Sequence, residues 1–167
     1  MTVHHTAAEL TNNSRAPALA RQHQRYHQDS GWPDLAYHFL VDAKGNVYEG
    51  RPVWARGDTF TSYDPTGHFL VCAEGHFDRH SIPAAQVAGV VDVLAWAAVE
   101  YGVSAATIAG HRDFASTTCP GDNFYPMIAD GSLRAAVEAR IADGAPTLSI
   151  WCGPEATARV AEIEAGG

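Results

Sequence analysis

The sequence has few basic residues. Lysine and arginine together number 11 against 19 aspartates and glutamates, so the 167-residue chain carries a formal net charge of −8 at pH 7. Nucleic acids and anionic membrane surfaces attract proteins through basic patches. We therefore expect no nucleic-acid partner. The sequence gives no indication of an oligomeric state.

A membrane span and a secretion signal are also missing from the sequence. The longest apolar run, AAQVAGVVDVLAWAAV, is interrupted by Asp92 and predicts a buried helix. The opening MTVHHTAAEL has neither the basic nor the apolar segment of a signal peptide. This favours a cytoplasmic protein, one released by cell lysis, or one whose leader has been removed.

Cysteine is scarce. Three cysteines are an odd number, so at least one lies outside any intrachain disulfide. Cys72 lies in a predicted strand and Cys152 near the C-terminus, and these two could pair or remain free thiols. If they pair, Cys119 is the unpaired cysteine.

The rest of the pattern predicts a single α/β domain, with 46% hydrophobic and 18% charged residues as in ordinary globular proteins. Strands are predicted at residues 1–7, 36–43, 47–51, 68–75 and 107–110, and helices at 12–32, 83–101, 123–131 and 132–144. This order gives a central mixed sheet flanked by helices. We expect residues 1–144 to form the domain and residues 145–167 a helical C-terminal appendage.

Three potential metal ligands lie at the ends of predicted strands. His4 ends the first strand, His111 follows the last one, and Cys119 lies in the loop that leaves it. Loops at one end of a sheet can converge on a site. Two imidazoles and a thiolate suit Zn²⁺ with a fourth position open to water. Because adjacent strand residues point to opposite faces, His4 and His5 cannot both reach the metal, and spacing does not say which one does.

Other interpretations of these residues are weaker. The stretch HRDF resembles the catalytic loop of protein kinases, but Thr118 stands where that loop requires asparagine, and no glycine-rich phosphate loop is present. A Cys–His nucleophile pair stays open, although the Pro-Gly turn after Cys119 provides no helix N-terminus to lower the thiol pKa. His23 and His27 share a helix face, which is more typical of surface or half-buried histidines than of a metal site.

Four segments, in order along the chain, carry a family resemblance. They are TVHHTA, GWPDLAYHFLVDAKGNVYEGR, GHFLVCAEGHFD and AGHRDFASTTCPGDNFY, and they span about residues 1–130. Together they resemble the type 2 zinc N-acetylmuramoyl-L-alanine amidases, the family that includes phage T7 lysozyme and the peptidoglycan recognition proteins. The resemblance implies a mixed sheet with helices on its faces, zinc as cofactor and peptidoglycan as substrate.

The resemblance also implies a role for each matching residue. It puts the zinc ligands on His4, His111 and Cys119, and the catalytic tyrosine on Tyr37 of YHF. Thr117 holds the place two residues before the cysteine, where phage members carry lysine and amidase-active recognition proteins carry threonine. The implied reaction is hydrolysis of the amide between the lactyl group of N-acetylmuramic acid and L-alanine. Tyr37 and Thr117 are expected to stabilise the oxyanion.

Residues 52–66 depart from the family pattern. Many relatives have a histidine in this loop, whereas this chain has Trp54, Arg56 and Asp58. Since an aromatic ring can stack on a sugar and arginine can pair with carboxylates, we expect Trp54 and Arg56 to bind substrate.

A second function remains open, that of a recognition module that binds muropeptide without cutting it. Family members of that kind commonly lack the cysteine ligand, and Cys119 is present here. In either case we expect a protein that acts on the cell wall, whether it is secreted, released by lysis or phage-encoded. The sequence does not separate these origins.

Overall fold

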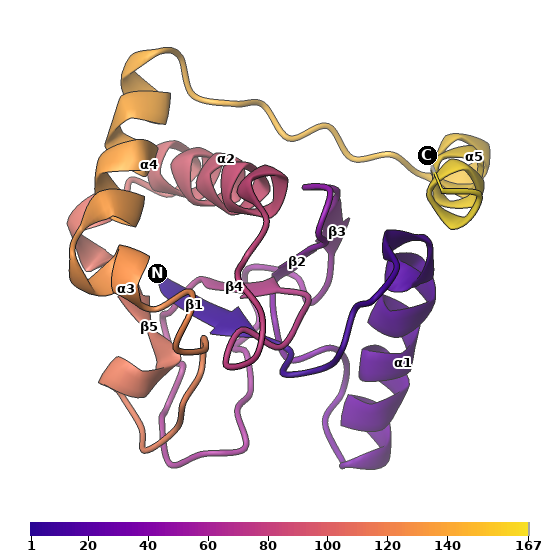
Figure 1. The fold of residues 1–167 in the computed structure, drawn as a ribbon, viewed down its shortest axis with the longest axis horizontal. Helices are drawn as coiled ribbons and strands as arrows, with labels where there is room; N and C mark the ends of the chain where they lie inside the picture. The colour runs from indigo at the N-terminus through magenta and orange to yellow at the C-terminus, as the bar shows by residue number, and fades with distance from the viewer. Residues whose placement is uncertain (167) are drawn as a thin grey trace.

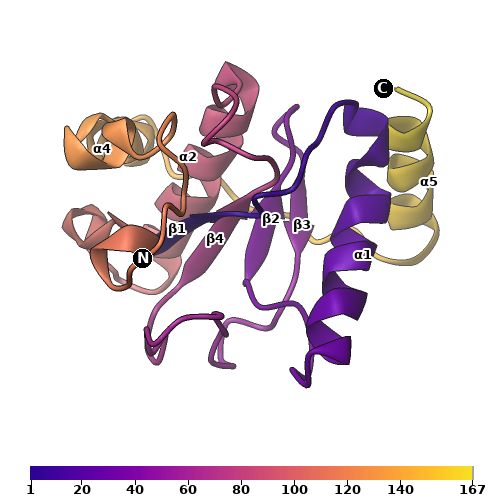
Figure 2. The same ribbon diagram turned by 60° about the horizontal axis from the view of Figure 1, so that its bottom comes forward.

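A computed structural model describes residues 1–166 and shows a five-stranded sheet with helices on both faces (Figures 1 and 2). The strands are β1 (Thr2–His5), β2 (Phe39–Val41), β3 (Val47–Glu49), β4 (Leu70–Ala73) and β5 (Ala109–Gly110). They are ordered β3-β2-β4-β1-β5. Only the β2–β3 hairpin is antiparallel among these neighbours, so the sheet is mixed, as predicted.

The helices of residues 1–166 cover the two faces of the sheet. They are α1 (Ala16–Asp29), α2 (Ala84–Glu100), α3 (Pro126–Ala129), α4 (Ser132–Ala142) and α5 (Gly153–Glu164), with short 3₁₀ helices η1 (Asn13–Arg15), η2 (Ala105–Thr107) and η3 (His111–Asp113). Helices α2 and α4 lie on one side of the sheet, and α1 with α5 on the other (Figure 2). No helix in residues 1–166 is long and apolar enough to cross a membrane.

The larger apolar core fills the space between the sheet and α2. Val3 of β1, Val41 of β2 and Val71 of β4 all point toward this side. They are completely buried, together with Val90 and Leu94 of α2. Burying each of these side chains contributes roughly 1.5–3 kcal/mol to folding. This face therefore supplies much of the stability of the domain.

The opposite face of the same strands is more polar. His4 is paired in register with Cys72, and Cys72 with Leu40, so these three side chains form a row across β1, β4 and β2. Leu35, Leu40 and Cys72 make a small apolar cluster beside His4. The row thus places one predicted metal ligand on the α1 side of the sheet.

The C-terminal segment returns to α1. Helix α5 lies alongside α1 (Figure 2), where Arg21 forms a 2.7 Å ion pair with Glu164. Arg159 donates to the Asn46 side chain at 2.6 Å, and Ile163 is 2% exposed. The segment after residue 144 therefore contains a helix that packs on the sheet domain, while the division of the chain at residue 144 stays a prediction.

All three cysteines are free. Cys72 is enclosed with Leu35 and Leu40 in the middle of the sheet, whereas Cys152 is exposed just before α5. The disulfide considered between them is therefore wrong.

Candidate metal centre

Three side chains from distant parts of the sequence meet at one point. His4 comes from β1, His111 from the start of η3 and Cys119 from the loop that follows it. Their potential ligand atoms all lie within 4.8 Å of one another, and His4 Nδ1 is 3.7 Å from Cys119 Sγ. All three residues are buried, with 1%, 7% and 7% of their surface exposed. The structure thus brings together the residues that the sequence predicted as ligands.

The choice between His4 and His5 follows from strand geometry. His5 points away from His111, and its Nδ1 accepts a hydrogen bond from the Phe77 backbone N–H at 3.2 Å. Its own backbone N–H donates to Cys119 Sγ at 3.4 Å. His5 therefore supports the thiol through its backbone, and His4 provides the imidazole.

The donor set fits zinc. Tetrahedral Zn²⁺ with Zn–N near 2.05 Å and Zn–S near 2.3 Å separates a nitrogen and a sulfur ligand by about 3.6 Å. The observed separation between His4 Nδ1 and Cys119 Sγ is 3.7 Å. Within residues 1–166, no group hydrogen-bonds His4 Nε2 although that atom is buried. Buried imidazoles normally have hydrogen-bond partners, so a ring with a thiol sulfur 3.7 Å from one nitrogen and no partner for the other is consistent with a metal-binding role.

The cysteine loop is held against the start of η3. Arg112 donates from its backbone N–H to the Cys119 carbonyl at 3.0 Å and from its guanidinium to the Thr118 carbonyl. Gly121 has a φ of +100°, and a Cβ there would lie 2.5 Å from the Phe77 backbone. Only glycine satisfies both conditions without strain. The Pro-Gly turn noted in the sequence thus lets the loop approach the segment after β4 and fixes the position of Cys119.

Burial controls the protonation of the three ligands. It lowers the pKa values of His4 and His111 below that of free histidine, so both rings are neutral at pH 7. It also raises the pKa of the Cys119 thiol to about 12. The histidines can therefore offer a lone pair directly, whereas the thiol must release its proton when a metal binds.

Tyr37 and Thr117 both lie near the candidate metal centre, but their hydroxyl groups have different surroundings. The Tyr37 ring is 5.1 Å from the His4 ring, and burial raises the pKa of its phenol well above the usual value. Thr117 is half-buried, and its hydroxyl accepts a hydrogen bond from the Cys119 N–H at 3.2 Å. Tyr37 thus stays a hydrogen-bond donor at neutral pH, while Thr117 has at least a role in shaping the loop.

Trp54 and Arg56 line a different cavity. This cavity of about 280 Å³ also contacts Met1, at the start of β1. Met1 is about 10 Å along the strand from His4 at 3.3 Å per residue. Trp54 is 88% exposed, and Arg56 pairs with Asp58 at 3.6 Å. Substrate binding by this pair stays a prediction.

A second aromatic group is connected to the candidate ligand His4 through successive ring contacts. Trp32 stacks on Phe60 with ring centroids 4.1 Å apart, and Tyr26 lies 5.8 Å from Phe60. His27 connects them to Tyr37, because its ring is 4.9 Å from Trp32 and 6.0 Å from Tyr37. Phe60 and Tyr26 are 63% and 58% exposed. We call Tyr26, Trp32 and Phe60 the aromatic rim. Sequence reasoning missed it because the contributing residues come from α1, its C-terminal turn and the 52–66 loop.

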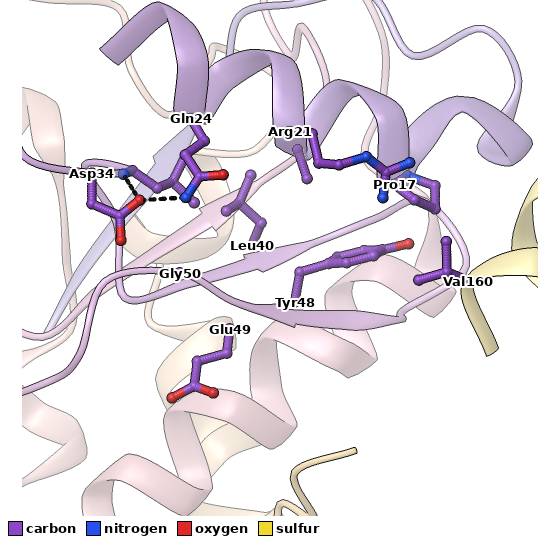
Figure 3. Close-up of a pocket in the computed structure, with 11 residues that line it drawn as sticks. Pro17, Arg21, Gln24, Asp34, Leu40, Tyr48, Glu49, Gly50 and Val160 are labelled. Carbon is purple, nitrogen blue, oxygen red and sulfur yellow. Dashed lines mark hydrogen bonds between the residues drawn. The ribbon is translucent and has the colours of Figure 1, made fainter. Parts of the chain in front are cut away.

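A pocket of about 180 Å³ separates α1 from the β2–β3 hairpin (Figure 3). Leu40 and Tyr48 lie on its sheet side, and Asp34 at its edge accepts hydrogen bonds from Gln24 and from the Leu35 N–H (Figure 3). The three candidate metal ligands do not line it. It is a gap between layers rather than part of the metal centre.

Comparison with known proteins identifies the family. A family profile described as N-acetylmuramoyl-L-alanine amidase matches residues 1–122, a range that contains all three candidate ligands. The chain belongs to this family. It is 35% identical to peptidoglycan-recognition protein SC2 of Drosophila melanogaster over 130 residues, 75% of this chain and 70% of that protein. It is 36% identical to the human N-acetylmuramoyl-L-alanine amidase over 132 residues, which are 75% of this chain but 23% of that protein.

Solved structures of related proteins have the same fold. The N-acetylmuramoyl-L-alanine amidase LysC of Clostridium intestinale has the same fold, with a TM-score of 0.67, 23% identity and coverage of 82% of this chain and 83% of that one. Human PGRP-IBETAC, solved in complex with glycosamyl muramyl pentapeptide, has a TM-score of 0.67 at 28% identity over 77% and 79% of the two chains. The family includes proteins named as amidases and proteins named for recognition, so membership alone does not decide between the two functions.

Proposed function

We propose that this protein is a zinc-dependent N-acetylmuramoyl-L-alanine amidase. The substrate is the amide that joins the lactyl group of N-acetylmuramic acid to L-alanine in peptidoglycan. The observation that carries the proposal is the convergence of His4, His111 and Cys119 with Tyr37 beside them. Three ligands match a catalytic zinc site, in which a fourth position stays open.

The three ligands prepare the centre for the metal. His4 and His111 are neutral at pH 7, and Cys119 gives up its proton on binding. When bound, zinc supplies a Lewis acid that polarises a carbonyl and makes water nucleophilic near pH 7. Because the ligands are buried, the medium around a bound metal would have a low dielectric constant. Electrostatic interactions between the metal and the substrate would therefore be stronger there than in water.

Tyr37 and Thr117 provide hydroxyl groups for the developing oxyanion. The raised pKa of Tyr37 keeps its phenol protonated, so it can donate a hydrogen bond to the oxygen of the attacked carbonyl. Thr117 accepts from the Cys119 N–H, which leaves its own hydrogen able to donate. Thr117 carries no charge, so we assign it the smaller effect of the two.

The aromatic rim is the surface on which the substrate extends from the metal. Its exposed rings reach the centre through His27 and Tyr37. Aromatic faces stack on the apolar faces of sugar rings as well as on other apolar groups. The relative solved with glycosamyl muramyl pentapeptide supports a peptidoglycan fragment as the ligand class.

The alternative is a recognition protein that binds muropeptide without hydrolysis, since several relatives are named for recognition. The complete ligand set favours the amidase. Either protein acts on the cell wall, and we propose that this one reaches the wall by secretion or after lysis.

The deciding experiment is digestion of purified peptidoglycan by the parent protein, by Cys119→Ser and by Cys152→Ser. We expect the parent to release new amino groups on L-alanine and no new reducing sugar ends. Cys119→Ser should lose both zinc and activity, since serine is a poor zinc ligand. Cys152→Ser is the matched control, because that thiol is exposed and lies outside the centre, and it should behave like the parent. Tight binding of muropeptide without new amino groups would instead support the recognition protein.

A further inference from the structure

The 52–66 loop reaches the second metal ligand through a chain of hydroxyl groups. Thr61 Oγ1 lies 2.9 Å from His111 Nε2, and 3.0 Å from Thr59 Oγ1. Thr59 Oγ1 in turn donates to the Tyr63 carbonyl oxygen at 3.3 Å. Four groups separated by up to 52 residues are therefore connected in one line.

The direction of this chain follows from its last member. A carbonyl oxygen can only accept, so the single hydroxyl hydrogen of Thr59 is directed to Tyr63. The Thr61 hydroxyl must then donate to Thr59, and its oxygen is left to accept from His111 Nε2. All three hydrogen bonds can form together only when His111 carries its proton on Nε2.

We propose that Thr61 is a positioning residue that holds His111 in the Nε2-protonated tautomer and leaves Nδ1 to face the metal. Metal-ligating histidines commonly donate their second ring N–H to a carboxylate, a backbone carbonyl or a water, which fixes the ring orientation and strengthens the ligand. In this chain the partner is a threonine hydroxyl rather than a carboxylate. The consequence for metal affinity rests on the zinc site proposed above, whereas the tautomer does not.

The 52–66 loop is held in place by Arg51, which fixes the position of Thr61. Arg51, 3% exposed, donates to the Arg56 carbonyl and to the Asp58 carboxylate, both at 2.6 Å. It also donates to the Asp34 carbonyl at 3.1 Å, which ties the loop to the segment before β2. A buried guanidinium that makes several charge-assisted bonds fixes the backbone from which Thr61 projects.

The first test reads the tautomer in the metal-free protein by long-range ¹H–¹⁵N NMR at about pH 7.5, where the ring is neutral. We expect His111 to be protonated on Nε2 in the parent and in Thr61→Ser, and to populate both tautomers in Thr61→Val. Thr157→Val, whose hydroxyl bonds within α5, is the matched control and should resemble the parent. A parent ring protonated on Nδ1 would overturn the proposal, and so would a Thr61→Val ring unchanged from the parent.

The second test measures zinc affinity by competition with a chromophoric chelator. Thr61→Val should bind zinc 10- to 100-fold more weakly than the parent. Thr61→Ser and Thr157→Val should bind like the parent, and equal affinity in Thr61→Val would contradict the role. If Thr61→Val does not fold, Thr59→Val takes its place, because it removes the next link of the chain. Neither test uses peptidoglycan, so a failed amidase assay and a failed Thr61 role are distinguishable.

Discussion

The two faces of the sheet are built by the same strands but differ in chemistry. On β1, Val3 turns toward α2 and is completely buried in the main core, while its neighbour His4 turns toward α1 and the metal centre. On β4, Val71 and Cys72 divide in the same way. One face is closed by apolar packing and the other collects buried polar groups. The comparison indicates that the residues that stabilise the fold and the residues of the candidate metal centre lie on opposite faces of the same strands. Substitutions on one face should therefore leave the other face largely unchanged.

The largest expected effect on the α1 side is that of Tyr37→Phe. The change removes one hydroxyl donor and should lower kcat by roughly a hundredfold or more, about 3 kcal/mol in the barrier. Zinc content and unfolding free energy should stay near those of the parent. Tyr101→Phe, at the end of α2, is the matched control. A Tyr37→Phe protein with full kcat would leave the phenol without a catalytic role.

On the α2 side, Leu94→Ala tests the stabilising face. Leu94 is completely buried, so its truncation should lower the free energy of unfolding by about 3 kcal/mol in urea titrations. Activity per folded molecule should be unchanged. Val99→Ala on the same helix, where the side chain is 55% exposed, should change stability by less than about 0.5 kcal/mol. A loss of zinc in folded Leu94→Ala would show that the two faces are not separable.

His27, on the α1 side of the sheet, should make the free energy of unfolding depend on pH. Burial, with the nearby charges of His23 and Arg51, lowers the pKa of His27 from 6.5 to about 4. Between these values the unfolded chain holds a proton that the folded protein does not, so stability falls as the pH drops, by up to about 1.4 kcal/mol per pH unit. Urea titrations of metal-free protein between pH 7 and about pH 5 should show this fall.

His27→Gln is the variant that isolates this contribution. Glutamine can still accept the Ala36 N–H that His27 Nδ1 accepts at 3.1 Å, but it does not titrate. The pH slope should therefore be smaller in His27→Gln than in the parent. An unchanged slope would assign the pH dependence to other groups.

The smallest expected effect is that of Phe60→Ala in the aromatic rim. Loss of this exposed ring should raise KM for muropeptide several-fold, about 1 kcal/mol, with kcat nearly unchanged. Trp54→Ala offers a direct comparison between the rim and the cavity that contacts Met1. Should Trp54→Ala weaken binding more than Phe60→Ala, the substrate would follow the loop toward Met1 rather than the rim.

The apolar layer of the fold could be predicted from the sequence. The run HFLVCAEG, apolar on both faces, and the long apolar run after Pro83 predict β4 and α2, because burial dictates residue type directly. The ligands followed from the family resemblance, while spacing left His4 and His5 equivalent. The register of His4 with Cys72 separates them, and register is set by strands far apart in the sequence.

The surroundings of the site were less predictable. Trp54 and Thr61 belong to the same loop and have no periodic pattern, yet only Thr61 contacts a ligand. Their positions depend on Arg51, which anchors the loop through backbone carbonyls that no residue pattern reveals. The sequence left a Cys72–Cys152 disulfide open for a similar reason, since pairing depends on where the two chain segments lie in space, and both thiols are free.

The central claim is that the buried His4–His111–Cys119 group holds a zinc ion that the reaction requires. The most direct test measures zinc per chain and the masses of the muropeptide products, before chelation, after chelation and after zinc is restored. We predict about one zinc per chain and lactyl-amide cleavage that stops on chelation and returns with zinc. Cleavage at an undiminished rate in protein stripped of metal would contradict the account.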